Sequence, residues 1–459
     1  MNRLLPCLTA MLLFTGIATA TDVSGDITTT TWAKANSPYR VTDSISVPTG
    51  NTLTIEPGVD VLFDKDVPFV VEGAIHVAGT EIDSVRFVKG IAEWGGIRIS
   101  GGDSSSFTYT RLSDGNADGY DTEELGSGQG GGIYCGRWNT RLSMDHCMVS
   151  KNASTGSGGG LASSDSFVYL ADCSFVGNTS SLGGAVFAEY GHVMTMTRCS
   201  ISGNSASGGG AAIKNYYTTM ELVSCMIREN HTDGIGAIVS SDARLMLTGC
   251  TVSVNTAAFH GGIYCSTGPH RWFDVALTNC IVWNNTPKQF SWWRCMGGLF
   301  EISINYSCIE GGYEGTGNIS ADPRFVDTVI GDFRLQSGSP CIGAGESGAD
   351  MGAFGWITTD SKNSVVFPLV YLRQNTPNPF NPTTTIPFTL ADDGAVSLRI
   401  YNVMGQQVRT LVRGHQKAGS HTVTWNGLDD RGNAVASGVY LYRLTVGKTV
   451  RVRRMTLVR

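Results

Sequence analysis

Residues 173–204 read CSFVGNTSSLGGAVFAEYGHVMTMTRCSISGN, and the chain on both sides repeats the pattern of this segment. A cysteine recurs along the repeats, and the first four intervals between these cysteines are 26, 26, 26 and 25 residues. An asparagine follows each cysteine five positions later. A period of this length is typical of stacked supersecondary units. The cysteines are Cys147, Cys173, Cys199, Cys225, Cys250 and Cys280, and the asparagines are Asn152, Asn178, Asn204, Asn230, Asn255 and Asn285.

The repeats contain short runs in which apolar and polar residues alternate, for example residues 193–197 and 244–248. Alternation with a period of two indicates β-strands, and the glycine, serine and asparagine between the runs indicate turns. Two or three strands fill one repeat and leave no room for a helix. The sequence therefore predicts an all-β chain whose main part is a right-handed parallel β-helix.

The repeated cysteines and asparagines are expected to form ladders, because coils stacked about 4.8 Å apart place residues of equal phase above one another. Cysteine is small and readily buried, so we expect the cysteines to pack inside the solenoid. A metal site would need ligands that converge on one point, whereas a ladder spreads them along an axis. The asparagines are expected at an inside corner, where stacked amides can satisfy one another.

The side chains of a parallel ladder point in parallel directions, which fits the near-perpendicular dihedral angle of a disulfide poorly. We therefore expect Cys173, Cys199 and Cys225 to be reduced. Cys265 and Cys295 stand outside the ladder and are the expected bridged pair.

The first twenty residues, MNRLLPCLTAMLLFTGIATA, combine an early arginine, an apolar run and a small-residue end. This combination predicts a signal peptide, residues 1–20, and hence a secreted protein. The apolar run is shorter than the roughly 20 residues that a bilayer requires, so no transmembrane segment is expected. The net charge of −6, without a basic cluster outside the last dozen residues, argues against nucleic acid as a partner.

The sequence changes character after the repeats. We assign residues 21–357 to the β-helix and residues 358–372 to a linker. Residues 373–459 contain alternating runs at the spacing of a small antiparallel Ig-like β-sandwich. The predicted fold class is thus all-β, with a right-handed parallel β-helix followed by this sandwich.

The glycine-rich segments before each cysteine and the segment Phe175–Asn178 resemble the repeats of polymorphic outer-membrane proteins, whose hallmarks are Gly-Gly-x-Ile and Phe-x-x-Asn. This resemblance implies a surface-exposed adhesin, with polysaccharide or cell-surface glycans as ligands. The fold is also similar to that of pectate lyases, which leaves a secreted polysaccharide lyase or glycoside hydrolase as the alternative.

The order and spacing of motifs in residues 373–459 resemble the C-terminal sorting domain of type IX secretion, which is related to Ig-like domains of flagellar hook-capping proteins. The resemblance implies export by the type IX machinery to the outer surface of a Gram-negative bacterium. The residues that carry it are Asn378, Pro379, Phe380, Asn381, Pro382, Gly438 and Tyr440.

No complete catalytic constellation is found. Residues 231–234, His-Thr-Asp-Gly, are similar to a polygalacturonase motif. Inverting hydrolysis requires two carboxylates that flank the scissile bond, and Asp233 has no evident second carboxylate. Enzymatic activity is therefore left open, and we lean towards a protein without it.

Two further groups are candidate binding residues. The loop that begins at residue 114 opens with the Asp-x-Asn-x-Asp-Gly pattern of a calcium loop, although its twelfth position is Leu125; an ordinary turn is an equal alternative. The tryptophans could stack on sugar rings or cover the end of the β-helix. Calcium, the only suggested cofactor, would bind Asp114, Asn116, Asp118 and Asp121, and glycans would bind Trp272, Trp283, Trp292 and Trp293.

Overall fold

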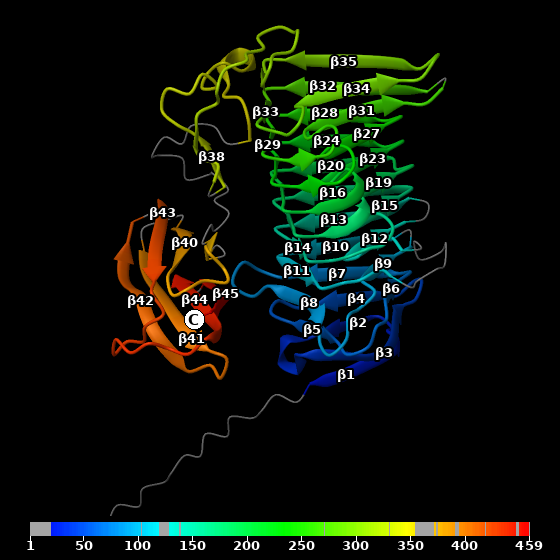
Figure 1. Ribbon diagram of the computed structural model, residues 1–459. Helices are drawn as coiled ribbons and strands as arrows, with labels where there is room; N and C mark the ends of the chain where they lie inside the picture. The colour runs from blue at the N-terminus through cyan, green and yellow to red at the C-terminus, as the bar shows by residue number, and fades with distance from the viewer. Residues whose placement is uncertain are drawn as a thin grey trace, which may run out of the picture. The chain divides into compact units, whose positions relative to one another are not determined.

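The computed structural model of the protein describes residues 20–101, 103–118, 128–136, 139–269, 271–329, 331–353, 371–372, 375–390, 394–417, 419–446 and 449–458. Parallel coils are followed by antiparallel sheets (Figure 1), so the predicted fold class is confirmed. The chain forms two compact units, residues 1–326 with 334–356 and residues 327–333 with 357–459. Of the predicted signal peptide only Ala20 is described, and of the predicted linker only Tyr371 and Leu372.

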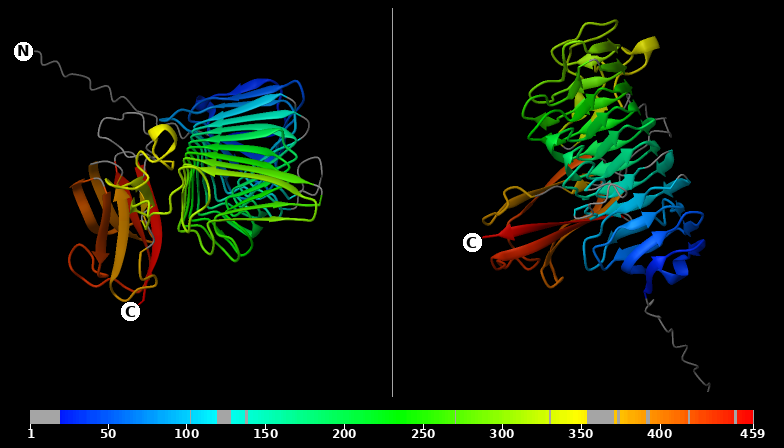
Figure 2. Two further views of the ribbon diagram at one scale, coloured as in Figure 1. Left: turned by 90° about the horizontal axis from the view of Figure 1, so that it is seen from above. Right: turned by 90° about the vertical axis from the view of Figure 1, so that its right-hand side faces the viewer.

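The coils of the first unit stack in parallel, and strands of equal phase form ladders (Figure 2). Ladder 1 consists of β2 (Thr30–Trp32), β4 (Thr52–Ile55), β7 (Ala74–Ala78), β10 (Ser104–Thr108), β13 (Thr140–Asp145), β16 (Ser166–Ala171), β20 (Val193–Thr197), β24 (Thr219–Val223), β28 (Arg244–Thr248), β32 (Trp272–Thr278) and β35 (Leu299–Asn305). Ladder 2 consists of β5 (Asp60–Phe63), β8 (Val85–Lys89), β11 (Thr110–Ser113), β14 (Met148–Ser150), β17 (Ser174–Val176), β21 (Ser200–Ser202), β25 (Met226–Arg228), β29 (Thr251–Ser253), β33 (Ile281–Trp283) and β36 (Cys308–Ile309).

Ladder 3 consists of β6 (Phe69–Val71), β9 (Ile97–Ile99), β12 (Ile133–Cys135), β15 (Leu161–Ser164), β19 (Val186–Glu189), β23 (Ile213–Tyr216), β27 (Ile238–Ser241), β31 (Ile263–Thr267) and β34 (Phe290–Arg294). A fourth, shorter ladder projects between ladders 2 and 3 and is called the arm: β18 (Thr179–Leu182), β22 (Ser205–Gly209), β26 (His231–Thr232) and β30 (Thr256–Ala257). The remaining elements of the stack and its flanking segment are β1 (Thr21–Asp26), β3 (Tyr39–Val47), η1 (Lys34–Asn36), β37 (Phe325–Asp327), β38 (Asp332–Leu335) and η3 (Glu346–Gly348).

The strands place their apolar residues inside the solenoid because successive side chains alternate between its two faces. In β20, for instance, Met194 and Met196 are buried, whereas Val193, Thr195 and Thr197 are only partly buried. These inward side chains join those of the other coils in one continuous hydrophobic core. The alternation that predicted strands from the sequence is thus the alternation of inside and outside.

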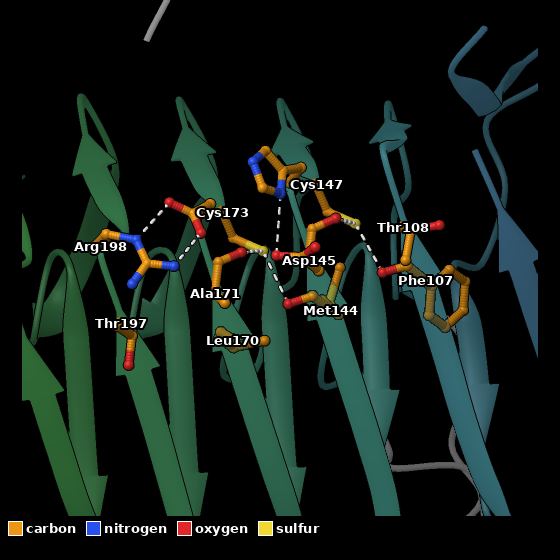
Figure 3. A network of polar contacts seen from close by, with 12 residues as sticks. Phe107, Thr108, Met144, Asp145, Cys147, Leu170, Ala171, Cys173, Thr197 and Arg198 are labelled. Atoms are coloured by element: carbon orange, nitrogen blue, oxygen red, sulfur yellow. Dashed lines mark hydrogen bonds and ion pairs between the residues drawn. The ribbon is translucent and has the colours of Figure 1, made fainter. Parts of the chain in front are cut away.

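The cysteine ladder lies at the corner between ladders 1 and 2, and the prediction that it is buried is confirmed. Cys173 is a free thiol whose Sγ donates to the carbonyl oxygens of Ala171 at 3.1 Å and Met144 at 3.5 Å (Figure 3). Burial raises the pKa of the Cys173 thiol. A protonated, buried thiol is chemically inert, so Cys173 serves packing.

The expected disulfide between Cys265 and Cys295 is wrong. Both residues are free thiols, and the residue opposite Cys265 on the next coil is Trp292. Cys265 belongs to the buried interior of ladder 3, whereas Cys295 follows the end of β34. The two cysteines stand out from the main ladder in the sequence, but the stacking register does not bring them together.

The asparagine ladder forms the next inside corner, as expected. Asn178 donates its Nδ2 to Asn204 Oδ1 at 2.9 Å and to the Val149 carbonyl oxygen at 3.0 Å, and its backbone N–H also donates to Asn204 Oδ1. The same contacts recur along the column. At the upper end of the column Gln289 Oε1 accepts the Nδ2 of Asn285 at 2.7 Å and so caps the ladder. No pattern in the sequence predicts this cap.

The paired glycines between the arm and ladder 3 are required by the sharp reversal of the chain there. Gly183 has φ +65°, which L side chains rarely adopt. A Cβ on Gly184 would lie 2.3 Å from the carbonyl oxygen of Ala211 on the next coil. A side chain at either position of this coil would therefore cause strain or a clash with the next coil.

The second unit contains two antiparallel sheets. One consists of β39 (Tyr371–Leu372), β40 (Thr384–Leu390) and β43 (Gly419–Trp425); the other consists of β41 (Gly394–Asn402), β42 (Gln407–Gln416), β44 (Gly438–Val446) and β45 (Thr449–Leu457). They enclose a separate core that includes Trp425, Tyr442 and Met455. No helix in the described part of the chain is long and apolar enough to cross a bilayer.

Candidate functional site

The outward face of ladder 3 carries side chains that change from coil to coil. In contrast to the inward ladders, no residue type recurs on consecutive coils along its first outward column. From the lowest strand of ladder 3 upwards this column consists of Val70, Arg98, Tyr134, Ala162, Phe187, Lys214, Val239, Tyr264 and Ser291.

The arm covers the lower part of this column. Leu182 of β18 packs on a small cluster formed by Tyr134, Ala162 and Phe187. One coil higher, the residue in register with Leu182 is Gly209, which has no side chain. The covering layer is therefore lost at the level of Lys214, and the outward face is open.

This opening is a depression of about 340 Å³, which we call the arm groove. A volume of this size lies at the lower end of the range of small-molecule sites. Its lining residues are Leu182, Gly208, Gly209 and Ile235 on the arm side and Lys214, Val239, Ser241, Tyr264, Ser266, Thr267, Gly268 and Trp293 on the ladder side.

A chain of polar groups runs along the ladder side of the groove. Lys214 Nζ donates to Ser241 Oγ at 2.9 Å, and Ser241 Oγ lies 3.0 Å from Ser266 Oγ. Burial lowers the pKa of Lys214 to about 8, and the carboxylate of Asp242 opposes this shift. The groove therefore offers an ammonium group and two hydroxyls along one line.

Aromatic rings line the upper part of the groove. Tyr264 stacks on His260 with ring centroids 4.9 Å apart, and Trp293, in register with Ser266, is 54% exposed. Below them Lys214 Nζ lies 6.0 Å from the centroid of the Tyr216 ring. Flat rings beside hydroxyls and a cation are the groups that bind sugars, because sugar rings have both an apolar face and polar edges.

The four tryptophans proposed from the sequence do not converge. Trp293 lines the arm groove, and Trp272 is equally exposed on β32 at 52%. Trp292 stacks on Phe300 at 4.4 Å in the last coil, directly above Cys265, where it covers the end of the core. Trp283 packs against the cluster that contains Ile281 and Cys308.

The predicted calcium loop follows the course of a coil over its described part. Asn116 pairs with Ala153 on the next coil, and its Oδ1 accepts the N–H of Asp118 at 3.2 Å. Asp118 Oδ1 accepts the N–H of Thr155 at 2.7 Å, and Asp114 Oδ2 accepts from Ser113 at 2.6 Å. These oxygens already have partners in the protein. Asp121 lies outside the described residues, so the calcium site stays a prediction.

Two groups of acids and histidines lie outside the groove. His231 Nε2 is 3.3 Å from Asp233 Oδ1, and both side chains are more than half exposed. Asp145, His146 and Asp172 have the spacing of metal ligands. However, Arg198 of the following coil donates Nε to Asp172 Oδ1 at 2.9 Å (Figure 3), and this ion pair neutralises the buried carboxylate. Neither group is a convincing catalytic centre.

A second depression, of about 500 Å³, lies beside the last coil. Two of its polar side chains are paired with each other, because Gln289, which caps the asparagine ladder, also donates to Glu310 Oε2 at 2.7 Å. Glu310 in turn accepts the backbone N–H of Asn284. We therefore assign this depression a structural role.

The residues of the predicted sorting motif hold the end of the sandwich together. Asn378 Oδ1 accepts the N–H of Thr456 at 2.9 Å. Phe380 is buried, and its ring centroid lies 5.5 Å from that of Trp425. Tyr440 donates its hydroxyl to the Ala436 carbonyl oxygen at 2.7 Å and packs against Trp425. Pro379, Asn381 and Pro382 are exposed, whereas Gly438, at the start of β44, is partly exposed.

Sequence reasoning missed the groove residues Lys214, Ser241, Tyr264 and Ser266. A signal was present: Lys214 breaks a strand position that is otherwise mostly apolar or aromatic in the repeats. The opening of the groove could not be predicted from the sequence, because it depends on the strand register that places Gly209 above Leu182.

Comparisons with known proteins describe parts of the chain. No curated protein matches it. Among solved structures, PorZ of Porphyromonas gingivalis, described as an essential bacterial surface component of the type-IX secretion system, is 26% identical over 20% of this chain, with a TM-score of 0.14. The match spans 11% of that relative, too little for a conclusion about fold or function. Residues 378–449 match the FlgD Ig-like domain, and the sandwich therefore contains a domain of this family.

Proposed function

We propose that the protein is a secreted, surface-displayed β-helix that binds glycans in the arm groove and is not an enzyme. The observation that carries this proposal is the groove itself, where Tyr264 and Trp293 stand beside the hydroxyls of Ser241 and Ser266. Aromatic faces stack on sugar rings, and hydroxyls exchange hydrogen bonds with sugar hydroxyls. An exposed, rigid wall of stacked strands is a suitable scaffold for such a site.

The same proposal includes export through the type IX machinery. It is supported by the signal peptide predicted for residues 1–20 and by the resemblance of residues 373–459 to type IX sorting domains. The exposed Asn381 and Pro382 belong to a unit with its own core, which suits recognition by an export machinery independently of the cargo.

Binding can be tested on a glycan array with the full-length protein and two matched variants. Trp293→Ala removes the aromatic side chain at the groove, and Trp272→Ala removes one of equal exposure on β32. We expect Trp293→Ala to lose binding to every glycan that the native protein retains, while Trp272→Ala keeps it. Equal loss in both variants, or in neither, would contradict the assignment of the groove.

The array glycans should also be incubated with the protein and assayed for new unsaturated or reducing ends. The described side chains around the groove include no pair of carboxylates suited to hydrolysis, and we expect no product. Formation of unsaturated ends would assign the protein to the lyases, and formation of reducing ends to the hydrolases.

Export can be tested by truncation after residue 370, which removes every described strand of the sandwich. We expect the truncated protein to stay in the periplasm of a type IX-competent host, while the full chain reaches the surface. Surface delivery of the truncated protein would refute the sorting role.

A further inference from the structure

We propose that the arm groove selects negatively charged glycans, whose carboxylate or sulfate group binds to Lys214. This inference rests on the proposed function, because it names the class of glycan that the same groove binds. The inference depends on the surroundings of the Lys214 ammonium group, which include, in the part of the chain that the structure describes, no carboxylate paired with it.

Lys214 lies in the wall of the groove at the coil where the covering side chain is lost. The coil below carries Phe187 at the same position, under Leu182, and the coil above carries Val239. A lysine between two apolar neighbours has its ammonium group partly withdrawn from water. Such a position costs free energy unless a partner compensates for the lost hydration.

Only part of that compensation comes from the protein. Among the described residues, Ser241 Oγ is the one hydrogen-bond acceptor of Lys214 Nζ, and no carboxylate lies within ion-pair distance of it. Asp242 acts on Lys214 through a longer-range attraction, and its Oδ1 already accepts from Thr267 Oγ1 at 2.9 Å and from the Gly268 N–H at 2.8 Å. Asp242 therefore holds Thr267 and Gly268 at the edge of the groove and accepts no hydrogen bond from Lys214. Donor N–H groups of Lys214 Nζ thus stay available for a ligand.

An anionic ligand would supply the missing acceptor. Charge-assisted hydrogen bonds from an ammonium group to a carboxylate or sulfate oxygen are about twice as strong as neutral ones. The rings of Tyr264 and Trp293 on the same side of the groove favour a charged group carried on a sugar ring over a free inorganic anion. A sugar acid or sulfated sugar can pair its acidic group with Lys214 and stack its ring on Tyr264 or Trp293.

The test measures binding of the full-length protein by isothermal titration calorimetry. For the carboxylate, the probes are a hyaluronan hexasaccharide and its carboxyl-reduced form, in which an uncharged hydroxymethyl group replaces each carboxylate. For the sulfate, the probes are oligosaccharides of dextran sulfate and of dextran. We expect one or both anionic probes to bind at least about tenfold more tightly than their neutral counterparts. The pair with the larger ratio identifies the acidic group.

Three variants separate charge from shape. Lys214→Met keeps an unbranched side chain without the ammonium group and is expected to lose the preference for the anionic probe, while Lys214→Arg keeps most of this preference. Lys89→Met removes a positive charge from an exposed position on β8 and should leave the preference unchanged. Thermal melting verifies that each variant is folded.

The outcomes distinguish the inference from the proposed function. If Trp293→Ala abolishes binding but Lys214→Met leaves the anionic preference intact, the groove binds glycans and the role of Lys214 is refuted. If neutral and anionic probes bind equally well to the native protein, the inference is also refuted. If no probe binds, both proposals fall.

Discussion

The two faces of the solenoid wall follow opposite rules. At the inside corners the same residue types return on six successive coils, as cysteine and as asparagine. On the outward column of ladder 3 the sequence Phe187, Lys214, Val239, Tyr264 has no repeat. An inward position is constrained by the coils above and below it, whereas an outward position is constrained by solvent or a ligand. Repetition therefore reports on the fold, whereas the outward positions are free to differ from coil to coil and so can build a local site.

The largest loss of stability is expected at the asparagine ladder. In Asn204→Asp, a carboxylate oxygen would replace the Nδ2 that donates to the Phe175 carbonyl oxygen at 3.0 Å and to Asn230 Oδ1 at 2.9 Å. Repulsion between buried acceptors should lower the free energy of unfolding by about 3 kcal/mol or more, measured by urea denaturation. The exposed control Asn139→Asp should change it by less than about 0.5 kcal/mol. Equal effects would show that the corner is not special.

A gain of stability is expected on the outward face. Lys214 has a pKa of about 8 in the folded protein against an ordinary value of 10.5, so between these pH values the unfolded chain binds the extra proton. The free energy of unfolding should therefore rise from pH 8 to pH 10, by at most about 3 kcal/mol and by less where water reaches the amine. Urea denaturation of Lys214→Met should show a higher stability at pH 7 and no such rise. A rise of the same size in this variant would assign it to other groups.

A smaller loss is expected in the cysteine ladder. The two ends of this column already carry hydroxyls: Thr110 donates to the Thr108 carbonyl oxygen and Ser307 to that of Asn305, each at 2.9 Å. Cys225, whose Sγ donates to the Val223 carbonyl oxygen at 3.4 Å, makes the same kind of contact. Cys225→Ser should lower the free energy of unfolding by about 1 kcal/mol, through the loss of the larger sulfur. A loss above about 3 kcal/mol would indicate that the thiol has a role beyond packing.

The smallest effect on stability is expected for the outward residue Ser266. Ser266→Ala removes one hydroxyl of the groove and should change the free energy of unfolding by less than about 0.5 kcal/mol. The same variant should weaken glycan binding several-fold, because it removes a hydrogen-bonding group from the groove. Retention of full affinity would place the ligand away from Ser266.

Most of the fold could be predicted from the sequence, because the residues that define the coils recur at a regular spacing. The spacing from Cys147 to Cys280 fixes the coil, and the fixed offset to each asparagine fixes the second corner. The capping of Asn285 by Gln289 could not be predicted from the repeat. Gln289 takes the place of the asparagine that the next coil lacks, and this replacement occurs only once in the chain. The groove was hidden for a similar reason. It arises where Gly209 takes the place of Leu182, and no spacing rule distinguishes that glycine from the many that make turns.

A crystal structure of the full chain soaked with the anionic oligosaccharide tests the central claim most directly. We predict electron density for the sugar between Gly209 and Trp293, with an acidic oxygen within hydrogen-bond distance of Lys214 Nζ. Density on the exposed end of the last coil, around Trp272 or Phe300, would contradict the claim that the arm groove beside Lys214 is the binding site.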